Sequence, residues 1–133
     1  MTPDELRHKE ALRWLEIAAR DLRAAGILVP VEPSVAVFHC QQAAEKSAKG
    51  FLVLHEVVFR KTHDLRELGT QCAEIDASLA SLLKEAANLT DYAVVFRYLD
   101  APHAADEAEA AQALDTARRL YDRIRALVET PAA

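Results

Sequence analysis

The apolar residues of this chain recur every three or four positions in each long segment, and no segment alternates as a β-strand would. The spacing predicts helices over about 3–26, 34–57 and 65–74, one that begins at 76 or 78, and a last one over about 106–129. The end of the fourth helix is left open by the pattern between 88 and 97, and residues 98–105 read as a loop. We therefore expect an all-α protein, an antiparallel bundle of four to five helices.

Local signals mark the ends of these helices. Thr2 and Glu5 fit a capping box around Pro3, and Asp64 begins a second such pattern with Glu67. Ser34 is the expected cap of the second helix, which follows a stop near residue 26 and two prolines. These signals support the predicted boundaries.

The same spacing predicts which side chains form the core and which face of the second helix meets solvent. We expect the core to contain Trp14, Ile17, Leu22, Phe51, Leu54, Leu82, Leu83, Leu120 and Ile124. The solvent face of the second helix is expected to carry Gln42, Glu45, Lys49 and Glu56.

Length and charge limit the class of protein. A chain of 133 residues suits one domain, here 1–133 with a core of about 4–129. The net charge of −5 argues against a general nucleic-acid binder, although it permits a local basic pocket. No leader and no apolar run long enough for a membrane span is visible, so we expect a cytoplasmic protein with reduced, packed thiols at Cys40 and Cys72.

The histidines do not have the spacing of a metal site. None of the five forms an HxxxH, HExxH or Cys/His pattern, and no phosphate-binding loop or dinucleotide fingerprint occurs. We therefore expect no metal and no cofactor. His39 and His55 are interpreted as residues that serve packing or solvation within the second helix.

Asp21 stands out because it falls within the apolar stripe of the first helix. A carboxylate there needs partners, since an unpaired buried charge is costly. One interpretation is a structural ion pair. The other is that Asp21 lines a functional pocket and orients a base or an arginine.

Two further patterns carry polar chemistry. The first is the run from Gln41 to Lys49, in which paired glutamines suit a helix interface and Glu45 precedes Lys49 in the favourable order. The second is Arg97 and His103, which flank five residues before the last helix. Histidine can transfer the proton of a ribose 2′-hydroxyl and arginine can stabilise charge on phosphorus, so this pair has the chemistry of metal-independent RNA cleavage.

Read together, four pieces of the chain resemble the HEPN domain family across about 10–128. They are Trp14 with Ala18-Ala19-Arg20-Asp21-Leu22, Phe38 with Gln41-Gln42-Ala43-Ala44-Glu45-Lys46 and Lys49, Lys61-Thr62-His63-Asp64-Leu65, and Leu89-Thr90 with Tyr92 and Arg97-Tyr98. The second piece is the most specific of the four.

The resemblance implies a helical bundle that commonly dimerises and pairs with a minimal nucleotidyltransferase, often as toxin and antitoxin. Many members are ribonucleases with an arginine and a histidine spaced like Arg97 and His103. Active members carry a polar residue directly after the arginine, whereas Tyr98 stands here. Some toxins carry a tyrosine shortly after the histidine, which the partner modifies, whereas Ala104 and Ala105 follow here.

Three functions follow from these observations. We expect a module that binds a nucleotide or a nucleotidyltransferase partner; the alternatives are a metal-independent ribonuclease toxin and a non-catalytic dimeric scaffold. The expected site has Arg97 and His103 at its centre, with Asp21, Gln42, Glu45, Lys46, Lys49 and Tyr98 as ligand-binding or supporting residues. A homodimer is expected in each case.

Overall fold

The computed structural model describes residues 1–89 and 104–130. Its elements are α1 (Pro3–Leu28), α2 (Pro33–Leu54), α3 (Leu65–Ile75), the 3₁₀ helix η1 (Ala77–Leu79), α4 (Ala80–Ala87) and α6 (Glu107–Glu129). Every regular element in the described part of the chain is a helix, and the predicted all-α bundle is confirmed. None of these helices is long and apolar enough to cross a membrane.

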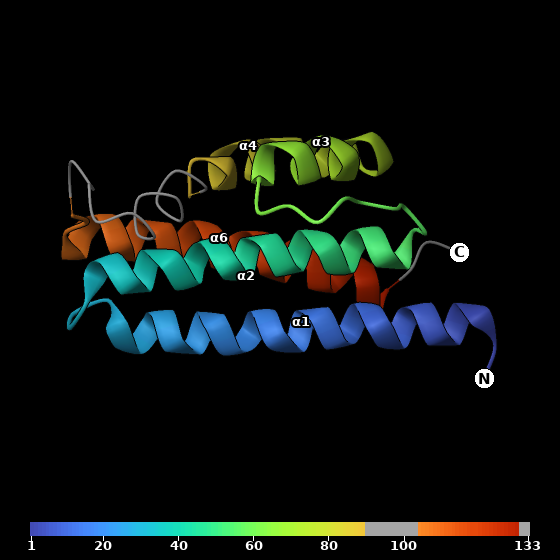
Figure 1. Ribbon diagram of the computed structural model, residues 1–133, viewed down its shortest axis with the longest axis horizontal. Helices are drawn as coiled ribbons and strands as arrows, with labels where there is room; N and C mark the ends of the chain where they lie inside the picture. The colour runs from blue at the N-terminus through green and yellow to red at the C-terminus, as the bar shows by residue number, and fades with distance from the viewer. Residues whose placement is uncertain (90–103, 131–133) are drawn as a thin grey trace.

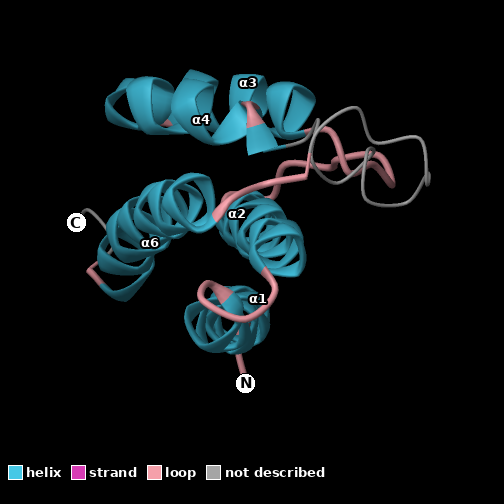
Figure 2. Ribbon diagram, turned by 90° about the vertical axis from the view of Figure 1, so that its left-hand side faces the viewer, coloured by secondary structure: helices cyan, strands magenta, loops and turns pink. Residues whose placement is uncertain are grey.

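The helices form two layers (Figure 1). The long helices α1, α2 and α6 lie side by side, with each one in contact with the other two. The shorter α3, η1 and α4 lie across α2 and α6 on the side away from α1, as the end-on view shows (Figure 2). As a result α2 is enclosed by three neighbours, whereas α1 keeps one broad face outside the bundle.

Side-chain caps define both ends of this arrangement. The capping box predicted at Thr2 and Glu5 is present, with each side chain bonded to the backbone of the other residue. Asp106 and Glu109 form a second capping box at the start of α6. Asp64 caps α3 by accepting from the amide of Arg66, but the predicted capping box with Glu67 does not form, and Glu67 accepts from Arg60 instead.

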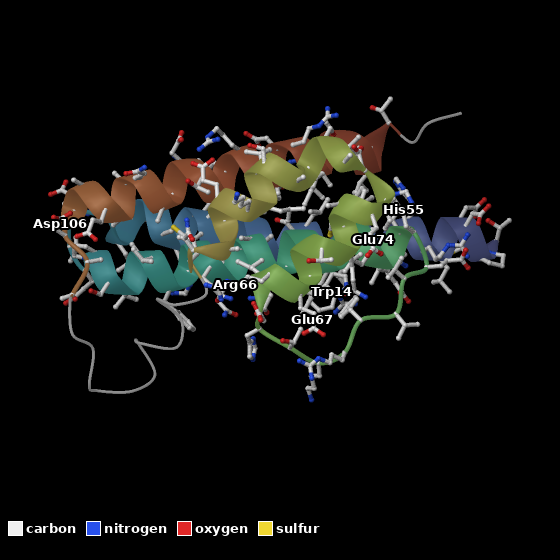
Figure 3. All side chains as sticks on the ribbon, turned by 90° about the horizontal axis from the view of Figure 1, so that it is seen from above. Trp14, His55, Arg66, Glu67, Glu74 and Asp106 are labelled. Atoms are coloured by element: carbon white, nitrogen blue, oxygen red, sulfur yellow. The ribbon has the colours of Figure 1, made fainter. Side chains whose placement is uncertain are left out.

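The start of α2 differs from the prediction that Ser34 is its cap. The helix already begins at Pro33, whose fixed φ suits a first helical position. The Ser34 hydroxyl instead accepts a hydrogen bond from the amide of Ala105, at 3.0 Å. This bond ties the start of α2 to the chain just before α6, at the end of the bundle where Asp106 lies (Figure 3).

The ends of the first two helices also differ from the pattern. α1 continues past Gly26 to Leu28, and α2 stops at Leu54 rather than near Val57. Glu56 then takes a left-handed conformation with φ of 58°, and the amides of Glu56 and Val57 bond back into the last turn. Glu56 is therefore part of the turn that ends α2 and not of its solvent face.

The buried side of α1 differs in part from the prediction. Leu15, which the pattern omitted, is buried, whereas Trp14 and Ile17 are only half-buried at the edge of the bundle. α1 packs on α2 and α6 from one side only, so its buried stripe is narrow. Leu22, Phe51, Leu83, Leu120 and Ile124 are buried as predicted, while Leu54 and Leu82 are half-buried.

Both cysteines lie in this core as unpaired thiols. Burial raises the pKa of Cys40 and of Cys72 to about 12. The two thiols therefore behave as small packed apolar groups, as the sequence indicated.

Candidate functional site

Several polar residues of α2 lie inside the structure and not on a solvated face. Glu45 and Lys49 are 3% and 7% exposed, so the prediction that they face solvent is wrong. The connector 55–64 and α1 flank this part of α2, and each supplies partners to it. We call His39, Gln41, Gln42, Glu45, Lys46 and Lys49 the α2 polar face.

Asp21 joins α1 to two residues of this face. Its Oδ2 accepts from the Nζ of Lys46 at 2.7 Å, and its Oδ1 lies 2.9 Å from the Nδ1 of His39. His39 and Lys46 stand seven positions apart, two turns along one side of α2, so one carboxylate reaches both. We call Asp21, His39 and Lys46 the Asp21 cluster.

The Asp21 cluster fixes the hydrogen-bonding character of its imidazole. An ionised carboxylate only accepts hydrogen bonds, so the Nδ1 of His39 is the nitrogen that carries a proton toward Asp21. In the neutral ring, Nε2 is then an acceptor. No residue in the described part of the chain bonds to that nitrogen, and 29% of the His39 side chain is exposed.

Glu45 is the centre of a second group, which we call the Glu45 cluster (Gln41, Glu45, Lys49 and His63). Its Oε1 accepts from the Nε2 of Gln41 at 3.3 Å and lies 2.7 Å from the Nδ1 of His63. Its Oε2 accepts from the Nζ of Lys49 at 3.3 Å. The Nε2 of Gln41 also donates to the backbone carbonyl of His63, so this cluster fastens the connector to α2.

Aromatic rings complete the surroundings of Lys49. Its Nζ lies 5.9 Å from the ring centroids of both Trp14 and Phe59, which pack edge to face. Phe59 belongs to the connector and Trp14 to α1, so the two rings approach Lys49 from different segments. The ammonium is therefore covered by α1 and the connector.

The two clusters are adjacent along α2. The side-chain amide of Gln42 donates to the Oε1 of Gln41 at 2.6 Å. Gln42 therefore contacts the Glu45 cluster. Paired glutamines at a helix interface were expected, and Gln41 has that role. Gln42 is half-buried and its side chain lies toward the same flank of α2 as Lys46.

Two grooves that are lined by described residues lie away from the Asp21 cluster. One of about 850 Å³ runs between α1 and α6, and one of about 430 Å³ lies between α3 and α4. Neither includes a residue of the Asp21 cluster. A ligand at this cluster would therefore bind on the open side of the face, where His39 and Lys46 are partly exposed.

The structure brings together five of the expected site residues: Asp21, Gln42, Glu45, Lys46 and Lys49. Arg97, Tyr98 and His103 lie outside the described residues. Within those residues, no group of three histidine, cysteine, aspartate or glutamate side chains is arranged to hold a metal ion.

Sequence reasoning missed two residues of the site, His39 and His63. A signal for His39 exists in its two-turn spacing from Lys46, which places both on one side of a helix. His63 stands in one of the four pieces that carry the family resemblance, but its contact with Glu45 depends on the path of the connector.

Comparison with known proteins adds two findings. The model of the HEPN domain matches residues 11–127. The crystal structure of TT1696 from Thermus thermophilus is similar, with a TM-score of 0.72 and 28% sequence identity over 88% of this chain and 97% of that one. No protein with a curated description matches the chain.

Proposed function

The chain belongs to the HEPN domain family, and on this premise we propose that it is a nucleotide-binding module whose ligand lies on the α2 polar face with a phosphate at Lys46. The observation that carries the proposal is the state of Lys46. Its ammonium has three donors, and among the described residues only Asp21 accepts from it. With 22% of the side chain exposed, the remaining donors are available to an anionic oxygen.

Arg97 and His103 belong to the same proposal as further phosphate contacts, with Tyr98 beside them. Tyr98 favours binding over turnover, because it stands where the active ribonucleases of the family carry a smaller polar residue. We also propose a homodimer, and pairing with a minimal nucleotidyltransferase as toxin and antitoxin. The exposed apolar side chains that a partner would cover on and just after α1 are Leu6, Leu12, Ile27 and Val31.

Calorimetry with ATP tests the binding site. We expect Lys46→Gln to weaken ATP binding at least tenfold, since a charge-assisted hydrogen bond contributes roughly 1.5–3 kcal/mol. The matched control is Lys9→Gln, which removes the same charge from the exposed side of α1 and should change affinity less than twofold. Equal effects of the two substitutions would contradict the assignment of the site.

The second candidate is a ribonuclease, and the spacing of Arg97 and His103 is the observation that favours it. The test is incubation of the purified protein with RNA in EDTA, beside Arg97→Ala and His103→Ala. Cleavage that survives the chelator, leaves a 2′,3′-cyclic phosphate and disappears in both variants would establish the nuclease. We expect no cleavage under the binding proposal.

A further inference from the structure

We infer that His39, oriented by Asp21, selects ribonucleotides over deoxyribonucleotides by accepting a hydrogen bond from the ribose 2′-hydroxyl at its Nε2. This inference rests on the proposed function, because it assumes that a nucleotide binds beside Lys46. It adds a specificity-determining residue, His39, and gives Asp21 the role of a positioning residue.

In the Asp21 cluster, one carboxylate holds both a residue that donates, Lys46, and a residue that presents an acceptor, His39. Asp21 uses a different oxygen for each partner, with Oδ2 on Lys46 and Oδ1 on His39. Lys46 therefore presents donors and the Nε2 of His39 presents an acceptor on the same side of α2. A nucleotide has the complementary pair, since its phosphate oxygens accept and its ribose hydroxyls donate.

A purely structural role explains the His39 contact less well. The ion pair with Lys46 already links Asp21 of α1 to α2. His39 lies within α2, whose backbone is held by the helix itself, so the contact orients the ring and does not place a chain segment. The contrast is His63, whose backbone carbonyl is also bonded and whose contact with Glu45 tethers the connector.

The Asp21 carboxylate makes the Nε2 of His39 an acceptor, and Asp21→Asn should reverse the tautomer of the ring. If the oxygen of the new side-chain amide keeps the bond to Lys46, its NH₂ group faces Nδ1 of His39 and donates to it. The proton of the ring then moves to Nε2, which becomes a donor and no longer matches a hydroxyl that donates. Packing changes little, because aspartate and asparagine have nearly the same shape.

The first measurement is the tautomer of His39. Nitrogen chemical shifts of the ring, recorded by NMR at a pH where the imidazole is neutral, should show the proton on Nδ1 in the wild type and on Nε2 in Asp21→Asn. The matched control is Asp122→Asn, which makes the same charge change on the exposed side of α6 and should leave the tautomer unchanged. A proton on Nε2 in the wild type would overturn the inference.

The second measurement is the affinity for ATP, 2′-deoxy-ATP and 3′-deoxy-ATP. The wild type and Asp122→Asn should bind 2′-deoxy-ATP about five- to tenfold more weakly than ATP, the value of one hydrogen bond. A loss of affinity confined to 3′-deoxy-ATP would contradict selection against deoxyribonucleotides. For Asp21→Asn and for His39→Phe, the affinities for ATP and for 2′-deoxy-ATP should lie within about twofold of each other.

The outcomes separate the inference from the proposed function. Equal binding of ATP and 2′-deoxy-ATP by the wild type, or a preference that persists in Asp21→Asn, refutes the role of His39 and leaves the nucleotide site in place. No binding of any of the three refutes both.

Discussion

Replacing one partner of the buried Glu45–Lys49 pair should destabilise the fold strongly, whereas replacing both should not. The side chains of Glu45 and Lys49 are 3% and 9% exposed, so either charge left alone would be poorly solvated. Removing one partner of a buried pair typically costs about 3–5 kcal/mol. Replacing both with apolar residues of similar size is often neutral.

The contacts of each side chain refine these magnitudes. In Lys49→Met, Glu45 keeps Gln41 and His63 as donors, so we expect a loss near the lower limit, about 3 kcal/mol. In Glu45→Met, the ammonium keeps only two aromatic rings as partners among the described residues, each worth about 0.5–2 kcal/mol. Gln41 and His63 each lose an acceptor. We therefore expect Glu45→Met to be the more damaging substitution.

Urea denaturation of the wild type, both single variants and the double variant gives the free energy of unfolding for a double-mutant cycle. We expect the double variant to be more stable than Glu45→Met, with a coupling energy above about 2 kcal/mol. Single losses below about 1 kcal/mol would mean that both side chains are solvated, as the helical pattern indicated. Additive losses would mean that the two charges are not paired. Either result would refute the buried ion pair.

Three further substitutions or measurements test the fold. In urea denaturation, the free energy of unfolding of Glu56→Gly should exceed that of Glu56→Ala by about 1 kcal/mol. Both variants lose the exposed pair with Arg7, and only glycine adopts the left-handed backbone conformation without strain. Gly50→Ala should lower the free energy of unfolding by about 1 kcal/mol, because the new Cβ would lie 3.0 Å from a side chain of α1. A higher melting temperature by circular dichroism would contradict this. Burial raises the pKa of Cys40 and Cys72 to about 12. Iodoacetamide at pH 9 should therefore leave both thiols unmodified in the native protein and label both in urea. Rapid labelling of the native protein would show that the core opens.

The sequence by itself determined the features that depend on neighbours along the chain. Helix formation, the capping box at Thr2 and Glu5, the cap at Asp64 and the start of the last helix near Asp106 each involve residues within a few positions of one another. The spacing of apolar residues also fixed the buried side of α6, where Leu120 and Ile124 lie in the core.

Only the tertiary structure decided the rest. Periodicity gives the direction of a side chain on its own helix, and not what covers it. Glu45 and Lys49 look solvated along α2 and become buried because the connector and Trp14 of α1 lie over them. Ser34 caps nothing because α2 begins one residue earlier.

The candidate site shows the same division. Asp21 is recognisable in the sequence as a carboxylate that needs partners, because it interrupts an apolar stripe. Its partners, His39 and Lys46, stand 18 and 25 positions away, and only the packing of α1 on α2 brings their nitrogens to its two oxygens. Charge pairing across helices depends on that packing, and the pattern within each segment of the sequence does not predict how two helices pack.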